Sequence, residues 1–285
     1  MLGIVGTIPQ KDFPLVYDEV SLKGENLLLG EKLIPVNRGT PAMIAAAVAT
    51  LNYMGKAKPT AYLVGDIGDG RGCEKLYKYL TSKIRSIPLK TLALHYFQPD
   101  VLLFKELLAA VNTMPQVPTL IADAGFMYVA KMGGDAPSFD LFTPDVGELA
   151  YLADEKAPHP FYTRGFILHE DNRVPDLIQK AYQHNNASKY MLIKGVIDYV
   201  VNQDGILAQI DTPNEEVLEA IGGTGDTLTG IVSAFVAAGI DTVTSATKAA
   251  KVNRIAGFLA EPTPATQVYD IIKQIPYALK QVFEN

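Results

Sequence analysis

Three glycines and an acid stand together in the run Gly222-Gly223-Thr224-Gly225-Asp226, directly before an apolar segment. Glycine lets the backbone turn tightly and approach a ligand closely. The free N–H groups at the start of the following helix favour an anion such as a phosphate. Asp226 would face that anion, where a carboxylate can take the proton from a hydroxyl that attacks phosphorus. The run therefore predicts a phosphoryl-transfer site with Asp226 as general base.

The same run also has a purely structural interpretation. The glycines can form an ordinary loop, and an aspartate at a helix start is more often a cap than a base. Taken alone, the run leaves both interpretations open, so the decision depends on other segments.

Two further candidates end apolar runs. Asp123 follows residues 119–122, and Lys194 follows residues 190–193. In open α/β sheets, ligands bind outside the carboxyl ends of the strands. Asp123 is therefore a candidate for substrate binding, and Lys194 for binding a phosphate as a point charge. The structural alternatives are a helix cap for Asp123 and a solvated strand-end lysine for Lys194.

A second anion site is predicted at Asn37-Arg38-Gly39-Thr40, which precedes an alanine-rich helix expected over 41–54. The N–H groups of that helix and Arg38 could hold a phosphate or carboxylate. Simple capping by Thr40 explains the same residues without a ligand. No metal spacing links the four histidines, and we expect structural or exposed roles for them: His95, His159, His169 and His184.

The elements that must position these residues alternate between short apolar runs and segments of helical spacing. Runs at 61–64, 91–94, 119–122 and 190–193 fit a mainly parallel sheet covered by helices. The Asp-Gly pair within Asn202–Gly205 predicts a hairpin, hence an antiparallel edge. Helices are expected at 227–238, 242–259 and 266–283, and the proline-rich residues 157–175 as a surface excursion.

Composition favours one folded domain over residues 1–285, with 48% hydrophobic residues to form a core. The net charge of -6 and the scattered basic residues argue against nucleic acid as a partner. Cys73 is the only cysteine, which fits a reducing compartment. We find no signal peptide and no run long enough for a membrane span, so we expect a cytoplasmic protein without a membrane partner.

These segments, in this order, resemble the ribokinase-like superfamily, and within it the branch of ATP- or ADP-dependent NAD(P)H-hydrate dehydratases. Gly222–Asp226, followed by Leu228 and Gly230, resembles the anion-hole motif and catalytic aspartate of that branch. The run 192–195 resembles its nucleotide-side strand end. The run 142–148 resembles its Thr-Pro-His-Pro-Gly-Glu motif, and 253–257 its His-Gly-x-Ala-Gly motif.

The resemblance implies a ribokinase-like three-layer α/β/α sandwich with a mainly parallel central sheet and an antiparallel edge. It implies ATP or ADP with Mg²⁺, a small-molecule substrate with a hydroxyl group, and Asp226 as catalytic residue. Glu148 is the implied magnesium residue. The expected nucleotide-binding residues are Lys194, Gly195, Gly222, Gly223, Thr224, Gly225 and Asn253, and the expected substrate-binding residues are Asn37, Arg38, Gly39, Asp123 and Asp145.

Two departures bear on the substrate. Asp145-Val146 replaces the His-Pro of the branch, and Asn253-Arg254 replaces its His-Gly. The run Val64–Gly70 resembles a sugar-kinase loop, although it lacks the Lys-Ser/Thr of a P-loop. A dehydratase is the leading interpretation. A sugar or hydroxymethyl-compound kinase and a non-catalytic adenine-nucleotide sensor are the alternatives, and a homo-oligomer stays open.

Overall fold

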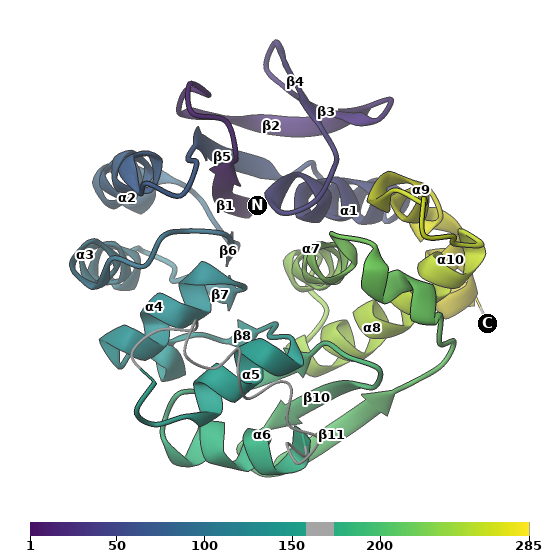
Figure 1. The fold of residues 1–285 in the computed structure, drawn as a ribbon. Coiled ribbons are helices and arrows are strands. Elements are labelled where there is room, and N and C mark those ends of the chain that lie inside the picture. Colours follow the sequence, from purple (N-terminus) through teal and green to yellow (C-terminus); the bar gives the residue numbers. More distant parts are fainter. Residues whose placement is uncertain (158–173, 285) are drawn as a thin grey trace.

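Six parallel strands form the middle of the sheet around which the chain folds (Figure 1). The computed structural model describes residues 1–157 and 174–284. Within them the sheet has eleven strands, in the order β11-β10-β9-β8-β7-β6-β1-β5-β2-β3-β4. The parallel strands are β9 (Tyr190–Ile193), β8 (Leu141–Phe142), β7 (Thr119–Ala122), β6 (Thr91–Leu94), β1 (Leu2–Ile8) and β5 (Thr60–Gly65).

Both edges of the sheet are antiparallel. At one edge, β10 (Asp198–Asn202) and β11 (Gly205–Ile210) form the predicted hairpin beside β9. At the other, β2 (Val16–Lys23), β3 (Asn26–Leu29) and β4 (Lys32–Pro35) continue the sheet from β5. The sequence analysis missed this second edge and the central strand β1.

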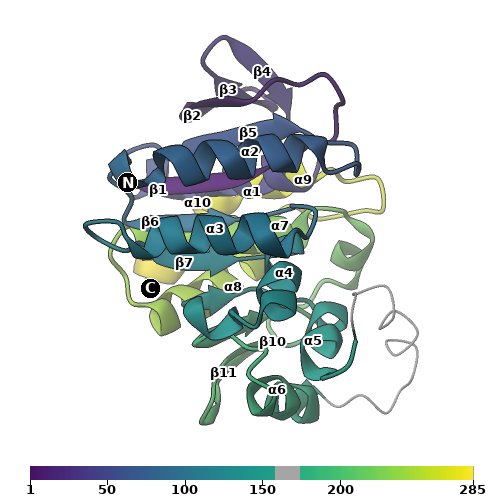
Figure 2. The ribbon, with the colours of Figure 1, turned by 90° about the vertical axis from the view of Figure 1, so that its left-hand side faces the viewer.

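Helices cover both faces of the sheet, each over its own hydrophobic cluster (Figures 1 and 2). One face carries α2 (Arg71–Lys83), α3 (Val101–Asn112), α4 (Gly125–Gly133), α5 (Val146–Ala153) and α6 (Val174–Gln183). The other carries α1 (Thr40–Tyr53), α7 (Thr224–Ala237), α8 (Thr242–Leu259), α9 (Val268–Ile272) and α10 (Ile275–Glu284). The predicted three-layer α/β/α sandwich is confirmed.

The close packing of α1 on α7 brings the two helix starts together. A methyl group added at Gly230 of α7 would lie 2.1 Å from the carbonyl oxygen of Met43, so only glycine allows this approach. The alanines of α1 are buried around the whole helix. Small residues on both helices thus place the first turn of α7 beside the first turn of α1.

Two local predictions were wrong. Gly39, with a φ of 67°, is the N-cap of α1, whereas the Thr40 hydroxyl is turned toward another partner. The expected helix over 266–283 is divided into α9 and α10. Most of the expected excursion at 157–175 lies outside the described residues. No helix within the described ranges is long and apolar enough to cross a membrane.

Candidate active site

A cleft of about 640 Å³ opens where the strands β7 and β9 end and α7 begins. Its walls gather ten of the residues predicted from the sequence: Asp123, Asp145, Glu148, Lys194, Gly195, Gly223, Thr224, Gly225, Asp226 and Asn253. Four others, Asn37, Arg38, Gly39 and Gly222, are not part of this lining. Arg38 and Gly222 lie close together, because a Cβ built at Gly222 would be 3.4 Å from Arg38 Cδ.

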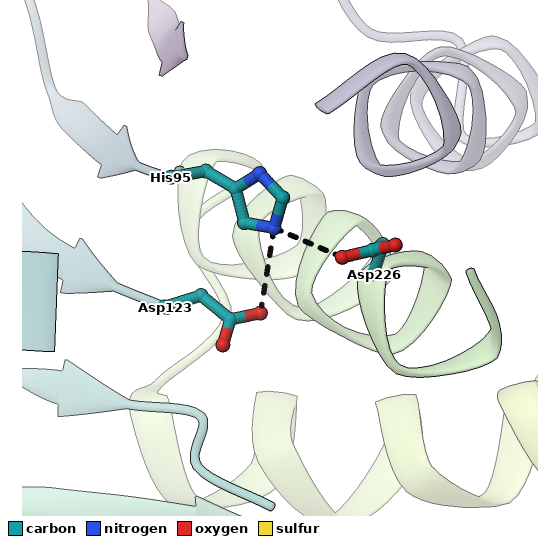
Figure 3. Close-up of side chains that lie close together, drawn as sticks. All are labelled: His95, Asp123 and Asp226. Carbon is teal, nitrogen blue, oxygen red and sulfur yellow. Dashed lines mark hydrogen bonds and ion pairs between the residues drawn. The ribbon is translucent and has the colours of Figure 1, made fainter. Parts of the chain in front are cut away.

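The Asp226 carboxylate is fixed by two donors from outside its own helix. Its Oδ2 accepts the backbone N–H of Gly39 at 2.7 Å, and its Oδ1 accepts His95 Nε2 at 3.0 Å (Figure 3). The N-cap of α7 is Gly223, and no side chain among the described residues caps this helix. Asp226 therefore does not act as the helix cap of the structural interpretation.

The environment keeps Asp226 ionised. Burial alone would raise its pKa, but the hydrogen bond and charge of His95, the charge of Lys194 and the N–H of Gly39 together lower that pKa below the ordinary value. A general base must be deprotonated at the working pH. Asp226 meets this requirement at neutral pH.

His95 is the site residue that the sequence analysis missed. Its side chain is fully buried, and its Nδ1 lies 3.1 Å from the hydroxyl of Thr40. An ionised carboxylate only accepts hydrogen bonds, so Nε2 carries the proton toward Asp226. The available signal was position: His95 directly follows the apolar run of β6, as Asp123 follows β7 and Lys194 follows β9.

Asp123 and Lys194 form a buried ion pair in the cleft wall. Lys194 Nζ lies 3.0 Å from both Asp123 oxygens. The hydroxyl of Thr229, one turn along α7 from Asp226, donates to Asp123 Oδ2 at 2.6 Å. Burial would lower the pKa of Lys194, but Asp123 and Glu148 raise it above the ordinary value. The ammonium group therefore stays charged.

His95, Asp123 and Asp226 have ligand-type atoms within 4.8 Å of one another, which is compact enough for a metal ion (Figure 3). His95 Nε2 lies 3.8 Å from Asp123 Oδ2. However, Lys194 contacts both Asp123 oxygens, and His95 donates to Asp226. A cation there would have to displace the ammonium group, so the cluster is better described as a hydrogen-bonded network.

Glu148 and Asp145 cap α5 at the cleft. Asp145 Oδ1 accepts the N–H of Glu148 at 2.7 Å, and Glu148 Oε2 accepts the N–H of Asp145 at 2.9 Å. Tyr128 donates its hydroxyl to Glu148 Oε1 at 2.9 Å. Burial raises the pKa of Glu148, and the charges of Asp145 and Asp123 add to this rise against that of Lys194.

The glycine turn presents an open helix start to the cleft. Gly223 has a φ of 107°, a conformation that other residues rarely adopt. Asn253 supports the turn from α8: its amide donates to the carbonyl of Thr224 at 3.1 Å and accepts from the hydroxyl of Thr227 at 2.6 Å. Asn253 thus supports the turn, and the turn residues Gly223, Thr224 and Gly225 line the cleft.

Arg254, next to Asn253 in the sequence, joins the part of the cleft wall formed by residues 195–198. Its Nε donates to Asp198 at 2.7 Å, and one terminal nitrogen donates to the carbonyls of Gly195 and Val196 at 2.9 and 2.8 Å. The N–H of Gly195 is also engaged, with Asp198 at 3.1 Å. Arg254 therefore shapes the cleft, and its charge is paired within the protein.

Residues 103–277 match the family model described as NAD(P)H-hydrate dehydratase. The chain belongs to this family. The match includes the glycine turn, Asp226 and the wall from Asp123 to Asn253. It confirms the resemblance found in the sequence.

The chain covers all of one relative and only part of another. An uncharacterized protein of Methanocaldococcus jannaschii is 41% identical over 243 residues, which is 85% of this chain and 100% of that protein. A bifunctional NAD(P)H-hydrate repair enzyme of Hyperthermus butylicus is 36% identical over 108 residues, 37% of this chain and 19% of that enzyme.

Several solved structures with a similar fold are kinases. The pyridoxal kinase of Staphylococcus aureus in complex with AMP-PCP and pyridoxal has a TM-score of 0.56 at 12% identity, covering 89% of this chain and 86% of the kinase. Phosphofructokinase-2 of Escherichia coli also has a TM-score of 0.56 at 12% identity, covering 98% and 100% of the two chains. At such identity the likeness shows the ribokinase-like fold.

Proposed function

We propose that this protein is an ATP- or ADP-dependent NAD(P)H-hydrate dehydratase. The observation that carries the proposal is the placement of Asp226, which is ionised, held by Gly39 and His95, and adjacent to the uncapped start of α7. A base and an anion site therefore lie side by side, as phosphoryl transfer to a hydroxyl requires. The family supplies the substrate class, a hydrated dihydronicotinamide.

The chemistry has two steps. Asp226 accepts the proton of the ring hydroxyl while the hydroxyl oxygen bonds to the terminal phosphorus of the nucleotide. The bond from that phosphorus to the bridging oxygen of the nucleotide breaks at the same time. The ring C–O bond then breaks, phosphate leaves with the electron pair, and loss of a ring proton forms the double bond. Hydroxyl and proton are thereby removed, and the nucleotide loses one phosphoryl group.

The nucleotide phosphates would lie against the glycine turn. The N–H groups at the start of α7 supply neutral donors for them, and the charged Lys194 stands beside Gly225. A Cβ built at Gly225 would be 3.6 Å from Lys194 Nζ. The anion site thus combines a helix start with one buried ammonium group, which suits the charge that spreads over the phosphoryl oxygens.

Glu148 and Asp145 fit the role of magnesium residues. Mg²⁺ takes one or two carboxylates, keeps several waters and binds substrate phosphates. Both acids line the same cleft as the glycine turn and Lys194. Asp145 has one carboxylate oxygen engaged in the capping box, whereas both oxygens of Glu148 already accept hydrogen bonds, from Asp145 and Tyr128, so Glu148 would hold the ion through water. The ion would neutralise phosphate charge.

A small-molecule kinase is the second candidate. It would use Asp226 for the same first step and stop at the phosphate ester. The favouring observation is that Asp145 and Asn253, which replace histidines of the family motifs, both line the cleft. A changed lining is compatible with a changed acceptor.

The nucleotide site is tested by calorimetry with ATP, ADP and AMP in the presence of Mg²⁺. We expect ATP and ADP to bind, because the helix start and Lys194 face the phosphates, and AMP to bind more weakly because it lacks the outer phosphates. If none of the three nucleotides binds at millimolar concentration, the proposed function is wrong.

His95 gives a prediction about pH. In His95→Phe, Asp226 loses its Nε2 donor but stays buried, so its pKa rises. A base with a higher pKa is protonated at higher pH, and we expect the acid limb of the turnover profile to move to higher pH. The measurement is turnover against pH for the folded variant. His95→Gln, whose amide can donate to Asp226, is the control that should move the limb less. Identical limbs in all three proteins would contradict this role.

A further inference from the structure

Tyr96 is a large aromatic residue that is partly exposed in the cleft. It follows His95 at the end of β6, lines the cleft and is 49% exposed. Buried aromatic residues of this protein pack in the two hydrophobic clusters, whereas Tyr96 belongs to neither. An open ring in a cleft is a contact surface for a ligand.

The backbone holds this ring in place at a conformational cost. Tyr96 has a φ of 41°, in the left-handed region that residues with a side chain rarely adopt. Its carbonyl accepts the hydroxyl of Thr7 at 2.9 Å, and its ring meets the His95 ring edge-on at 4.3 Å. Strained backbone of this kind gathers at ligand sites, where surrounding contacts maintain it.

The ring also borders the base. A Cβ built at Gly39, whose N–H holds Asp226, would lie 3.6 Å from Tyr96 Cε2. Burial of the hydroxyl and the nearby charge of Asp226 raise the pKa of Tyr96, so the ring stays neutral. A substrate whose hydroxyl reaches Asp226 therefore has the Tyr96 ring as its neighbour.

The polar groups around Tyr96 are already paired with one another. Asp226 accepts from His95 and Gly39, and Asp123 accepts from Lys194 and Thr229. A sugar needs a partner for each of several hydroxyl groups, because unpaired polar groups in a cleft are costly. The ring of a hydrated dihydronicotinamide needs an aromatic face for its conjugated part and a partner for one reacting hydroxyl.

We infer that Tyr96 is the acceptor-side platform of this site and selects substrates whose ring has a conjugated, planar part, such as the N–C=C–carboxamide part of hydrated dihydronicotinamide, over saturated sugars. The inference rests on the proposed function for the position of the reacting hydroxyl. Stacking of a flat ring on an aromatic side chain contributes enough that its loss weakens binding about tenfold.

The test compares the wild type with Tyr96→Leu and Tyr96→Phe. Dissociation constants are measured by calorimetry for NADHX, pyridoxal, ribose and fructose 6-phosphate, with Mg·ATP measured in the same preparations. Leucine has no aromatic ring, but like phenylalanine it has to adopt the positive φ of residue 96. The two variants therefore share any backbone strain and differ in the aromatic face. We expect Tyr96→Leu to weaken NADHX binding about tenfold, Tyr96→Phe to bind it at least severalfold tighter than Tyr96→Leu, and Mg·ATP to bind alike throughout.

Equal affinity of Tyr96→Leu and the wild type for NADHX and pyridoxal would overturn the inference. So would a wild-type preference for ribose or fructose 6-phosphate. If those sugars are phosphorylated in a reaction that needs Asp226, phosphoryl transfer stands and the ring selection fails. If Mg·ATP does not bind while NADHX and pyridoxal still bind through Tyr96, the nucleotide-dependent function fails and the platform stands.

Discussion

Asp226→Asn is expected to lower turnover at least about 10²-fold, the low end of what general-base catalysis contributes. The amide is neutral and cannot accept the hydroxyl proton as the oxygen attacks phosphorus. The fold and the nucleotide affinity should be largely kept, because the glycine turn and Lys194 are unchanged. The measurement is the turnover rate of the folded variant, with nucleotide affinity determined alongside.

The site can accommodate asparagine with little rearrangement. Its Oδ1 can accept the N–H of Gly39, and its amide group can donate to His95 Nε2 if the imidazole proton moves to Nδ1 and then faces the Thr40 hydroxyl. A loss of turnover would thus report the missing base and not a collapsed site. Turnover near that of the wild type would remove Asp226 from the mechanism.

Gly225→Val is expected to weaken nucleotide binding at least about tenfold, the effect of losing one charge-assisted phosphate contact. A Cβ at this position would lie 3.4 Å from Lys194 Cδ, so the branched side chain of valine would crowd both the phosphates and the lysine. The glycine-only backbone angle of the turn lies at Gly223, not at Gly225. Crowding is therefore the cause that this variant isolates.

Calorimetry with ATP checks the prediction, and Gly225→Ala provides the graded control. Alanine adds one carbon atom and should weaken binding less than valine does. A thermal unfolding curve identifies variants that do not fold. If folded Gly225→Val bound ATP as the wild type does, the phosphates would have to lie elsewhere in the cleft.

Much of the central sheet could be predicted because its signals are local. The runs at 91–94, 119–122 and 190–193 are strands β6, β7 and β9 with the same bounds. Buried parallel strands read as continuous apolar runs, and each of these three is followed by a residue of the site, of which Asp123 and Lys194 line the cleft. Asp123 and Lys194 were found in this way.

The parts that were missed depend on contacts distant in sequence. The strand β1 lies between β5 and β6, and β2 pairs with β5 at the edge of the parallel sheet. No local sequence pattern predicts these pairings. His95 belongs with Asp226 only because α1 packs closely on α7 and β6 ends beside them. A single buried histidine has no spacing signal, so only its position after a strand could have identified it.

The departures from the family motifs have separate consequences. Arg254 is paired with Asp198 and with backbone carbonyls, so it maintains the cleft wall. Asn253 braces the glycine turn through Thr224 and Thr227. The two residues that stand in place of His-Gly therefore support the glycine turn and the cleft wall of this chain.

The most direct test of the proposed dehydratase follows the dihydronicotinamide absorbance while the wild-type protein is incubated with NADHX, Mg²⁺ and either ATP or ADP. The proposal predicts that absorbance is restored only when nucleotide is present, with one phosphoryl group released for each dihydronicotinamide formed. Nucleotide consumption that leaves a stable phosphorylated product, with no recovery of absorbance, would contradict the dehydratase and identify a kinase.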